Sequence, residues 1–347
     1  MALILDTYRF PTGSYRARLQ EALFTAVIKE LPNHQFWVPS TPTLPNISAF
    51  SNVNTVPFPA QTGLLAASKT RKWLQQCQAS QFISLHRTLK TKVPLRQVRI
   101  ADPVPAVTEF REITSADFTG WCSPWGQQEF IKNHPHSSSC LLNGFWPRLT
   151  VPDEFDNQLV KHSLTGGREY FICTDLHLNT PAFITLLKGF SHFKKRLQSS
   201  WKLVVVLRSG EAISPSEAEK LMAAYKFRQD VTLTTEDDLF AKLKGAYCLV
   251  SLNKEERFPL EIEEAAQTKT PIITQSTQSL ESLYKGDNFI RISDANSENI
   301  GEQLMRLYKS ESLRAQMAAA AATIEEALAG SNGLDIFIGQ LKQKQAE

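Results

Sequence analysis

Short apolar runs alternate with amphipathic stretches through the second half of the chain. The apolar runs begin near Tyr170, Leu203, Val231, Ala246, Pro271 and Phe289. A strand that is covered on both faces reads as a nearly continuous apolar run, so this alternation predicts a parallel sheet with helices on both sides. Between two of these runs, Ser214, Pro215 and Glu217 have the spacing of a capped helix start.

The first half shows the same kind of pattern, less cleanly. Residues 2–6 form an apolar run that ends at Asp6, residues 15–30 carry an apolar stripe at helical spacing, and residues 35–38 resume as a strand. This order predicts a strand, a helix and a second strand, which is the opening of an α/β domain. Further strands are predicted near Val53 and at 81–85, 98–101, 120–122 and 140–142, with a helix from Ser123 to about Lys132.

The periodicity lapses between Phe145 and His162, where two prolines interrupt the pattern. At 347 residues the chain is long enough for two domains with separate cores. We therefore predict an α/β protein with two Rossmann-like, doubly wound domains and a short amphipathic helix at the end. The expected bounds are 1–150, 151–330 and 331–347.

Composition narrows the class of protein. Hydrophobic residues make up 42% and charged residues 21% of the chain, as in soluble globular proteins. A net charge of +3 excludes the strongly basic surface of a nucleic-acid-binding domain. No apolar stretch reaches the roughly 18 residues of a transmembrane helix. Five widely spaced cysteines without a C-x-x-C pair predict neither disulfides nor a zinc site, so we expect a cytoplasmic protein without a bound metal.

One basic cluster has two interpretations. It consists of Arg87, Lys90, Lys92, Arg96 and Arg99. These residues form either a solvated loop or a surface that contacts anionic lipid or a lipid-linked acceptor. The second interpretation would place the protein peripherally at the inner face of a membrane.

The stretch from Glu255 to Thr274 reads as a loop, an amphipathic helix and a buried strand. In open α/β sheets ligands bind at such an edge, because strand carboxyl ends meet helix amino termini there. Glu256 lies in the predicted loop and Glu264 eight residues later in the helix. Carboxylates accept hydrogen bonds from vicinal hydroxyls, so this pair suits a sugar nucleotide. The alternative is a solvated helix face that presents Glu261, Glu263 and Glu264 to water.

This stretch resembles a family signature. The similarity lies in Glu256-Arg-Phe-Pro-Leu-Glu-Ile-Glu-Glu264-Ala and Thr270-Pro-Ile-Ile, which follow the E-G-F-G-x-P-x-x-E-A…G-x-P-V-I pattern of the glycosyltransferase family 4 group. The resemblance is closest from Gly167 to about Met317. It implies a GT-B fold, in which two Rossmann-like domains face a cleft and the last helix returns to the first domain. It also implies a nucleotide-diphosphate sugar as the ligand, a glycan or lipid-linked acceptor, and retaining transfer without a metal.

The resemblance implies roles for individual positions. Glu264 would accept hydrogen bonds from the nucleotide ribose, and Glu256 would reach the donor sugar. Arg208 matches one of the two cations that hold the departing diphosphate, and Gly13 belongs to the glycine loop across the cleft. Asp102 remains from a histidine–aspartate pair beside the donor. Glu256, Arg208 and Asp102 are therefore the catalytic candidates.

The diphosphate cations are incomplete relative to the family. The family's R-K-N motif falls on Thr180, Pro181 and Ala182. No lysine or arginine occurs between Arg168 and Lys188, so the difference does not depend on the alignment. Preorganised cations stabilise the departing diphosphate, and their loss weakens transfer.

Other departures lie around the same cleft. Ala101 stands in place of the histidine, and Asp175 in place of the glycine that ends the strand. Arg257 and Pro259 replace the two loop glycines. Pro259 offers no amide proton, whereas Arg257 is a candidate to restore positive charge near the donor.

These departures favour a divergent homologue with an eroded site, non-catalytic or weakly active, in bacterial-type polysaccharide assembly. Such a protein would bind a nucleotide, a glycan or a partner glycosyltransferase. The first alternative is an active retaining hexosyltransferase that uses Arg208 and Arg257 in place of the lost pair. The second is a structural partner of another transferase, which would bind no nucleotide.

Overall fold

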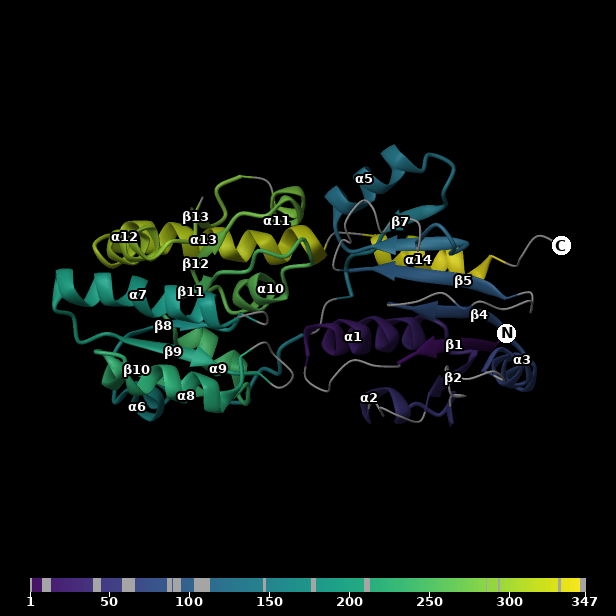
Figure 1. Ribbon diagram of the computed structural model, residues 1–347, viewed down its shortest axis with the longest axis horizontal. Helices are drawn as coiled ribbons and strands as arrows, with labels where there is room; N and C mark the ends of the chain where they lie inside the picture. Colours follow the sequence, from purple (N-terminus) through teal and green to yellow (C-terminus); the bar gives the residue numbers. More distant parts are fainter. Residues whose placement is uncertain are drawn as a thin grey trace.

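The computed structural model describes most of the chain (Figure 1). The described residues are 2–7, 14–39, 45–57, 66–85, 89, 95–102, 113–145, 148–175, 179–208, 213–284, 286–292, 294–329 and 332–343. The predictions for Gly13, Arg87, Lys90 and Lys92 lie outside these ranges.

A parallel sheet is built by the described residues of the first half. It has seven strands in the order β3-β2-β1-β4-β5-β6-β7, and neighbouring strands are parallel. The strands are β1 (Ala2–Asp6), β2 (Gln35–Pro39), β3 (Val53–Val56), β4 (Ala79–Ser84), β5 (Arg96–Ala101), β6 (Phe118–Trp121) and β7 (Ser139–Leu141). The helices in this half are α1 (Tyr15–Glu30), α2 (Pro45–Ser48), α3 (Ala66–Cys77) and α5 (Pro124–Asn133).

A second parallel sheet follows, with six strands over the described residues in the order β10-β9-β8-β11-β12-β13. The strands are β8 (Tyr170–Cys173), β9 (Lys202–Val206), β10 (Val231–Thr234), β11 (Cys248–Ser251), β12 (Ile272–Gln275) and β13 (Ile290–Ile292). Its helices are α6 (Asn157–Thr165), α7 (Thr180–Leu197), α8 (Pro215–Ala223), α9 (Leu239–Gly245), α10 (Leu260–Gln267), α11 (Gln278–Leu283), α12 (Ser297–Tyr308) and α13 (Glu311–Ala329), with the 3-10 helix η2 (Arg228–Asp230) before β10.

Each sheet reverses its winding once. In the first sheet β1 lies between β2 and β4, and in the second β8 lies between β9 and β11. Such a reversal leaves a crevice at the carboxyl ends of the central strands, where α/β proteins bind ligands. Asp175 follows β8, Arg208 follows β9 and Glu256 follows β11, so the topology places these candidates at one edge.

The second sheet is apolar because helices cover both its faces. All residues of β8 and β11 are buried. On one side α7 and α12 pack closely, and a Cβ added to Gly189 of α7 would lie 2.6 Å from Cγ2 of Ile300. The predicted helix start is confirmed, because the Ser214 hydroxyl accepts a hydrogen bond from the amide of Glu217 at 3.2 Å.

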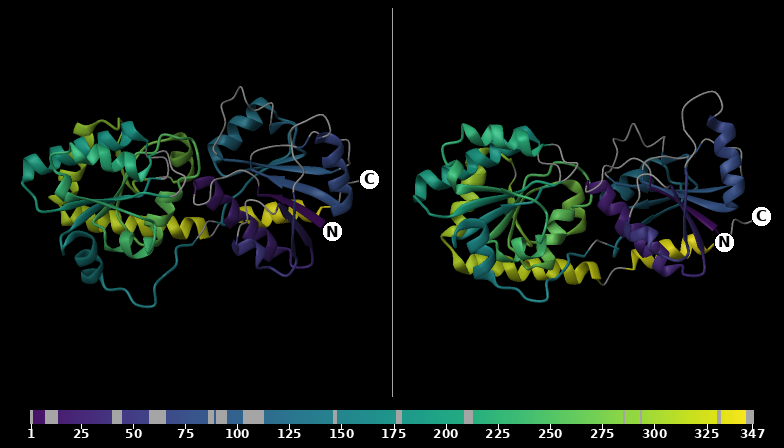
Figure 2. Two further views of the ribbon diagram at one scale, coloured as in Figure 1. Left: turned by 60° about the horizontal axis from the view of Figure 1, so that its bottom comes forward. Right: turned by 90° about the horizontal axis from the view of Figure 1, so that it is seen from below.

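The last helix, α14 (Gly333–Lys342), packs on the first sheet although it follows the second in sequence (Figures 1 and 2). The ring of Phe337 lies 6.1 Å from that of Phe118 in β6. The side-chain amide of Gln81 donates to the Leu341 carbonyl at 2.6 Å. The two ends of the chain therefore contribute to one packing unit.

One interpretation of the basic cluster is corrected by the fold. Arg96 and Arg99 belong to β5 and are not part of a solvated loop. Arg96 lies over the Phe118 ring and donates to the carbonyl of Gln340 in α14. Across the described ranges, no helix combines the length and the apolar character needed to cross a bilayer.

Candidate functional site

The site lies where the carboxyl ends of β8, β9 and β11 meet the first half of the chain. Asp102, directly after β5, accepts a hydrogen bond from the amide of Phe258 at 2.7 Å. The other oxygen of Asp102 accepts a hydrogen bond from the hydroxyl of Tyr15, the first residue of α1. The signature loop of the second half is thus bonded directly to two elements of the first.

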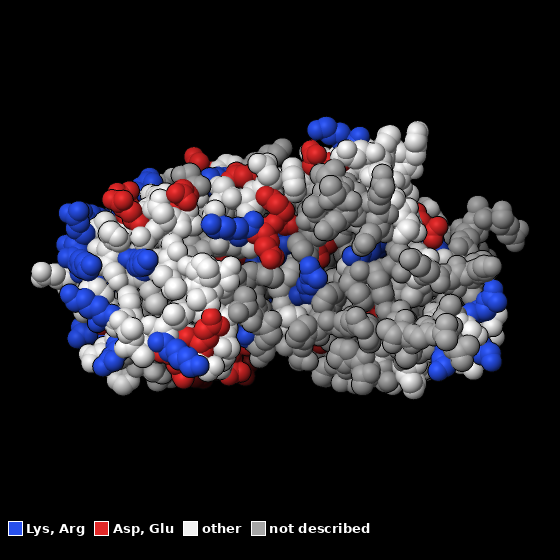
Figure 3. All heavy atoms as spheres, viewed as in Figure 1, with Lys and Arg blue, Asp and Glu red and all other residues white. Residues whose placement is uncertain are grey.

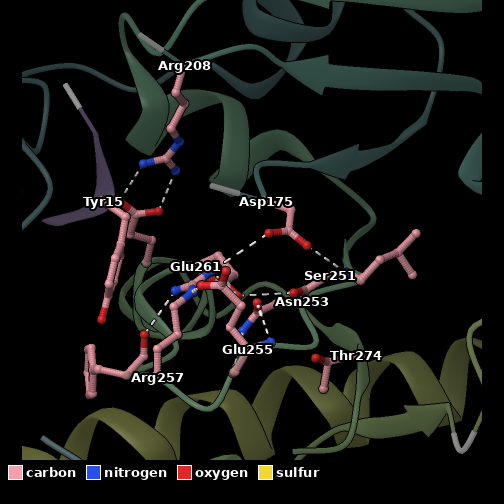
Figure 4. Close-up of polar contacts among 12 residues, drawn as sticks. Tyr15, Asp175, Arg208, Ser251, Asn253, Glu255, Arg257, Glu261 and Thr274 are labelled. Atoms are coloured by element: carbon pink, nitrogen blue, oxygen red, sulfur yellow. Dashed lines mark hydrogen bonds and ion pairs between the residues drawn. The ribbon is translucent and has the colours of Figure 1, made fainter. Parts of the chain in front are cut away.

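Arg257 fills the centre of this site (Figure 4). Its side chain is fully buried, donates to Glu261 at 3.1 Å, and pairs with Asp175 at 3.8 Å. The guanidinium lies 4.4 Å from the centre of the Tyr15 ring, a cation–π geometry. Burial lowers the pKa of Arg257, but Glu261 together with Tyr15, Asp175 and Asp102 raises it well beyond its ordinary value. Arg257 therefore carries a permanent charge that the protein itself neutralises.

Three of the residues that differ from those implied by the resemblance form one cluster. Arg257 and Asp175 replace glycines, and Glu261 stands at the signature's proline. Glu261 also accepts from the Ser251 hydroxyl at 3.2 Å, and Asp175 from the amide of Leu252 at 3.0 Å. A buried charge is costly without a partner. The three substitutions compensate one another because they place opposite charges in contact.

Glu264 is occupied by two arginines. Its carboxylate accepts hydrogen bonds from both terminal nitrogens of Arg208, at 3.1 and 2.5 Å. Arg18 of α1 also pairs with it at 3.2 Å, and Arg18 reaches Glu236 at the same distance. Burial lowers the pKa of Arg208, but Glu264 raises it above its usual value. Both oxygens of the expected ribose acceptor are therefore already bonded.

The interpretation of α10 as a solvated acidic face is wrong. Glu261, Glu263 and Glu264 are 0%, 2% and 1% exposed. Each has a partner brought by the fold, and for Glu263 this is the hydroxyl of Tyr284. Buried carboxylates persist because they are paired.

Glu256 caps a helix. One of its oxygens accepts from the amide of Gln278 at 2.9 Å, and the other from the amide of Ser279 at 2.7 Å. These amides open α11, where the backbone donors have no partner within the helix. The carboxylate expected at the donor sugar thus takes the place of an N-terminal anion at α11.

Asp102 has a shifted pKa. Burial raises it to about 6, although hydrogen bonds from Tyr15 and Phe258 act in the opposite direction. Burial, and secondarily Asp102, raises the pKa of Tyr15 well above its ordinary value. Asp102 is therefore protonated more readily than an exposed aspartate, at the point where it bridges the two halves.

The positions of the R-K-N motif form the first turn of α7. Asn179 caps this helix by accepting from the amide of Ala182 at 3.0 Å, and Thr180 donates to Glu217. Ala101, in place of the histidine, ends β5 and is buried. Over the described ranges, no cluster of histidine, cysteine, aspartate and glutamate is arranged to hold a metal ion.

Further contacts join the two halves beside the site. The hydroxyls of Ser123 and Ser279 lie 3.0 Å apart, and the amide of Trp125 donates to Ser282 at 3.2 Å. These bonds connect the start of α5 with α11, the helix that Glu256 caps. Contacts between the halves therefore also reach α11.

Sequence reasoning did not single out Tyr15, Arg18 or Glu236. Tyr15 and Arg18 lie three residues apart on one face of α1, just after the glycine loop. Their position directly after that loop is the feature of the sequence that could have identified them as site residues. Their partners lie more than 80 residues away, and sequence spacing does not reveal such pairs.

Solved structures with this architecture identify the fold. WaaG, described as a glycosyltransferase involved in lipopolysaccharide biosynthesis, is 12% identical, with a TM-score of 0.70 over 99% of this chain and 100% of its own. Anabaena Alr3699/HepE, solved with UDP and glucose, is 12% identical, with a TM-score of 0.69 over 98% of each chain. A putative UDP-N-acetylglucosamine 2-epimerase from Listeria monocytogenes is 11% identical, with a TM-score of 0.65 over 98% and 95%.

The chain therefore has the GT-B fold, an α/β architecture of two Rossmann-like domains, and the predicted fold class is confirmed. Residues 161–323 match the profile of the family described as glycosyl transferases group 1. A search of curated proteins gave no match. At these identities the structural likeness establishes the fold, and activity has to be argued from the site.

Proposed function

We propose that this protein is a non-catalytic or weakly active homologue of the nucleotide-sugar glycosyltransferases, with a donor site closed by its own ion pairs. The observation that carries the proposal is the burial of Glu264 with both oxygens bonded to arginines. The match over residues 161–323 supports the kinship, and the departures from the signature support the loss of transfer.

The energetics disfavour a nucleotide at Glu264. Glu264 is 1% exposed, and Arg208 and Arg18 occupy three of the roughly four acceptor positions of its carboxylate, so ribose hydroxyls reach it only if one of these arginines moves. Breaking a buried ion pair so that one charge is left unpaired costs about 3–5 kcal/mol. A hydrogen bond to a charged group returns only about 1.5–3 kcal/mol. Exchanging an arginine for ribose hydroxyls at Glu264 is therefore unfavourable unless other contacts of the nucleotide contribute the missing binding free energy.

The charge of the described site also opposes a diphosphate. The guanidinium groups of Arg18, Arg208 and Arg257 are all paired, and a fourth, that of Arg16, acts electrostatically on Asp102. They face five carboxyl groups, those of Asp102, Asp175, Glu236, Glu261 and Glu264. A transferase needs a net positive surface for its leaving group. This balance supports a role in binding a glycan, a lipid-linked acceptor or a partner transferase in polysaccharide assembly.

Calorimetric titration of the full chain with UDP, GDP and their sugars tests the proposal, followed by an assay for released nucleotide. We expect dissociation constants no tighter than about 1 mM and negligible donor hydrolysis. Micromolar binding with donor hydrolysis that Arg208→Ala abolishes would overturn the proposal in favour of an active hexosyltransferase. Arg306→Ala, on the exposed face of α12, is the matched control.

Glu264→Gln distinguishes nucleotide binding through Glu264 from nucleotide binding elsewhere in the cleft. If the wild type binds a nucleotide without hydrolysing the donor, this variant shows whether Glu264 is the ribose acceptor. Binding through Glu264 predicts a loss of about tenfold or more, because a charge-assisted hydrogen bond is weakened. Unchanged affinity would place the nucleotide elsewhere in the cleft.

A further inference from the structure

A groove lies between the connecting segment 148–156 and helices α6 and α9, with a cavity of about 770 Å³. Figure 2 shows that this segment extends away from the two sheets before it leads into α6. The groove has apolar walls that include Phe155, Leu159, Leu164 and Leu239. It is separate from the buried cluster around Arg257.

The groove exposes apolar side chains. Val151, Phe155 and Leu159 are 65%, 38% and 67% exposed. Of the five large hydrophobic residues that are exposed in the described ranges, these three fall within nine consecutive positions. A concentration of this kind marks an interaction site more often than scattered surface residues do. Val151 lies beyond the cavity lining, so a small molecule in the cavity would leave it uncovered.

The rim of the groove is acidic. Glu154, Asp156, Glu236 and Asp238 line it, and Asp153 and Asp237 are adjacent in sequence. The lining also contains three basic residues, Arg18, Arg148 and Lys242. Arg18 pairs with Glu236 and Glu264, while Lys242 donates to the carbonyls of Thr235 and Asp237. Glu236 is paired with Arg18, and the lining as a whole has four carboxyl groups against three basic residues, so it carries a small excess of negative charge.

The exposed positive charge of the second half lies elsewhere. Figure 3 shows lysine and arginine side chains gathered at the end of the molecule that carries α7 and α8. Exposed residues there include Lys195, Arg196, Lys226 and Arg228. The charge of the groove is thus a local property, opposite in sign to the chain's net charge of +3.

We propose that this groove binds a cationic amphipathic helix of a partner protein. Leucine-like residues at i, i+3, i+4 and i+7 of such a helix pack on Phe155 and Leu159, and its lysines and arginines face Glu154 and Asp238. The groove adjoins the closed site, because Arg18 lines the groove and also pairs with Glu264. The interaction requires no nucleotide, so its test is independent of the donor-binding assay.

The probe is a fluorescent peptide of about 14 residues with leucines at these helical positions and lysines elsewhere. A scrambled peptide of the same composition and a glutamate version serve as peptide controls. Fluorescence anisotropy with the full chain should show saturable binding to the amphipathic lysine peptide. Binding should weaken with salt, because the contacts at the rim are exposed ion pairs.

Paired variants assign the binding to the groove. Phe155→Ser with Leu159→Ser should weaken binding about tenfold or more. Ile131→Ser with Ile336→Ser removes two hydrophobic residues that are 42% and 47% exposed outside the groove, and should change affinity less than about twofold. All four side chains are exposed, so an unchanged circular dichroism spectrum and melting temperature are expected.

A second pair tests the charge of the rim. Glu154→Gln with Asp238→Asn should weaken binding about threefold and reduce its salt dependence. Asparagine tolerates the left-handed backbone of Asp238, whose φ is 51°. The proposal would be overturned if the lysine peptide showed no saturable binding, or if the scrambled peptide bound equally well. It would also be overturned if the groove and control variants lost affinity equally, or if UDP displaced the peptide.

Discussion

Arg257 gives the most direct test of the coupled substitutions. Replacing it with methionine retains an unbranched apolar side chain but removes the charge that Glu261 and Asp175 share. The cation–π contact with Tyr15 is lost at the same time. Because the guanidinium is fully buried, we expect Arg257→Met to lower the free energy of unfolding by about 3–5 kcal/mol at pH 7.

Urea unfolding followed by circular dichroism measures this loss. With an m-value of about 2 kcal/mol/M, the midpoint should fall by roughly 1.5–2.5 M. Arg228→Met, at an exposed arginine of η2, should change stability by less than about 0.5 kcal/mol. The double variant Arg257→Met with Glu261→Gln should lose about 1–3 kcal/mol less than the sum of the two single variants, because each removes the same ion pair.

Two results would refute this reasoning. One is a loss below about 1 kcal/mol for Arg257→Met with an unchanged m-value, since surface substitutions have effects of that size. The other is additivity of the two single variants, which would mean that the guanidinium and the carboxylate are not energetically coupled.

Three further predictions concern other parts of the fold. Asp102→Asn should remove a pH dependence. Burial raises the pKa of Asp102 from 3.8 to about 6, so the folded state binds more protons in that window. In urea titrations the wild type should therefore lose about 2–2.5 kcal/mol of stability relative to the variant between pH 4 and pH 7. A pH-independent difference would contradict this. Gly189→Ala should cost about 1–3 kcal/mol through the clash with Ile300, whereas Gly339→Ala, with open space at its Cβ, should not destabilise in the same melting assay. Glu256→Ala should cost about 1 kcal/mol by leaving the amides of Gln278 and Ser279 without their acceptor, while the N-cap Thr277 is retained, and no loss would show that these two bonds are dispensable.

The sheets could be predicted from the sequence because their strands are apolar on both faces. The runs near Leu203 and Ala246 became β9 and β11, and all residues of β11 are buried. The signature around Glu256 also placed the loop and α10 correctly. These features depend on local pattern, which a single sequence records.

The partners of the acidic residues could not be predicted in the same way. Glutamate on an amphipathic helix normally faces water, so periodicity alone left a solvated α10 open as an alternative. Glu264 is buried because Arg208, 56 residues away, and Arg18 of the first half both reach it. Glu256 likewise finds its amides at the start of α11. Such pairings are set by topology and are not visible as spacing.

Under the proposed function, the contacts among Arg257, Asp175 and Glu261 keep the GT-B fold stable in a site that holds no donor. Returning Arg257 alone to glycine would leave Asp175 and Glu261 without their shared cation, and returning Asp175 alone would leave the amide of Leu252 without its acceptor. Each single reversal therefore costs stability, whereas the three together exchange one closed set of contacts for another. The contacts of these three side chains lie beyond the ends of β8 and β11, whose own residues are all buried. The packing that specifies the fold is thus separate from the charged contacts of Arg257, Asp175 and Glu261, so a change in these contacts leaves the apolar interiors of the sheet in place.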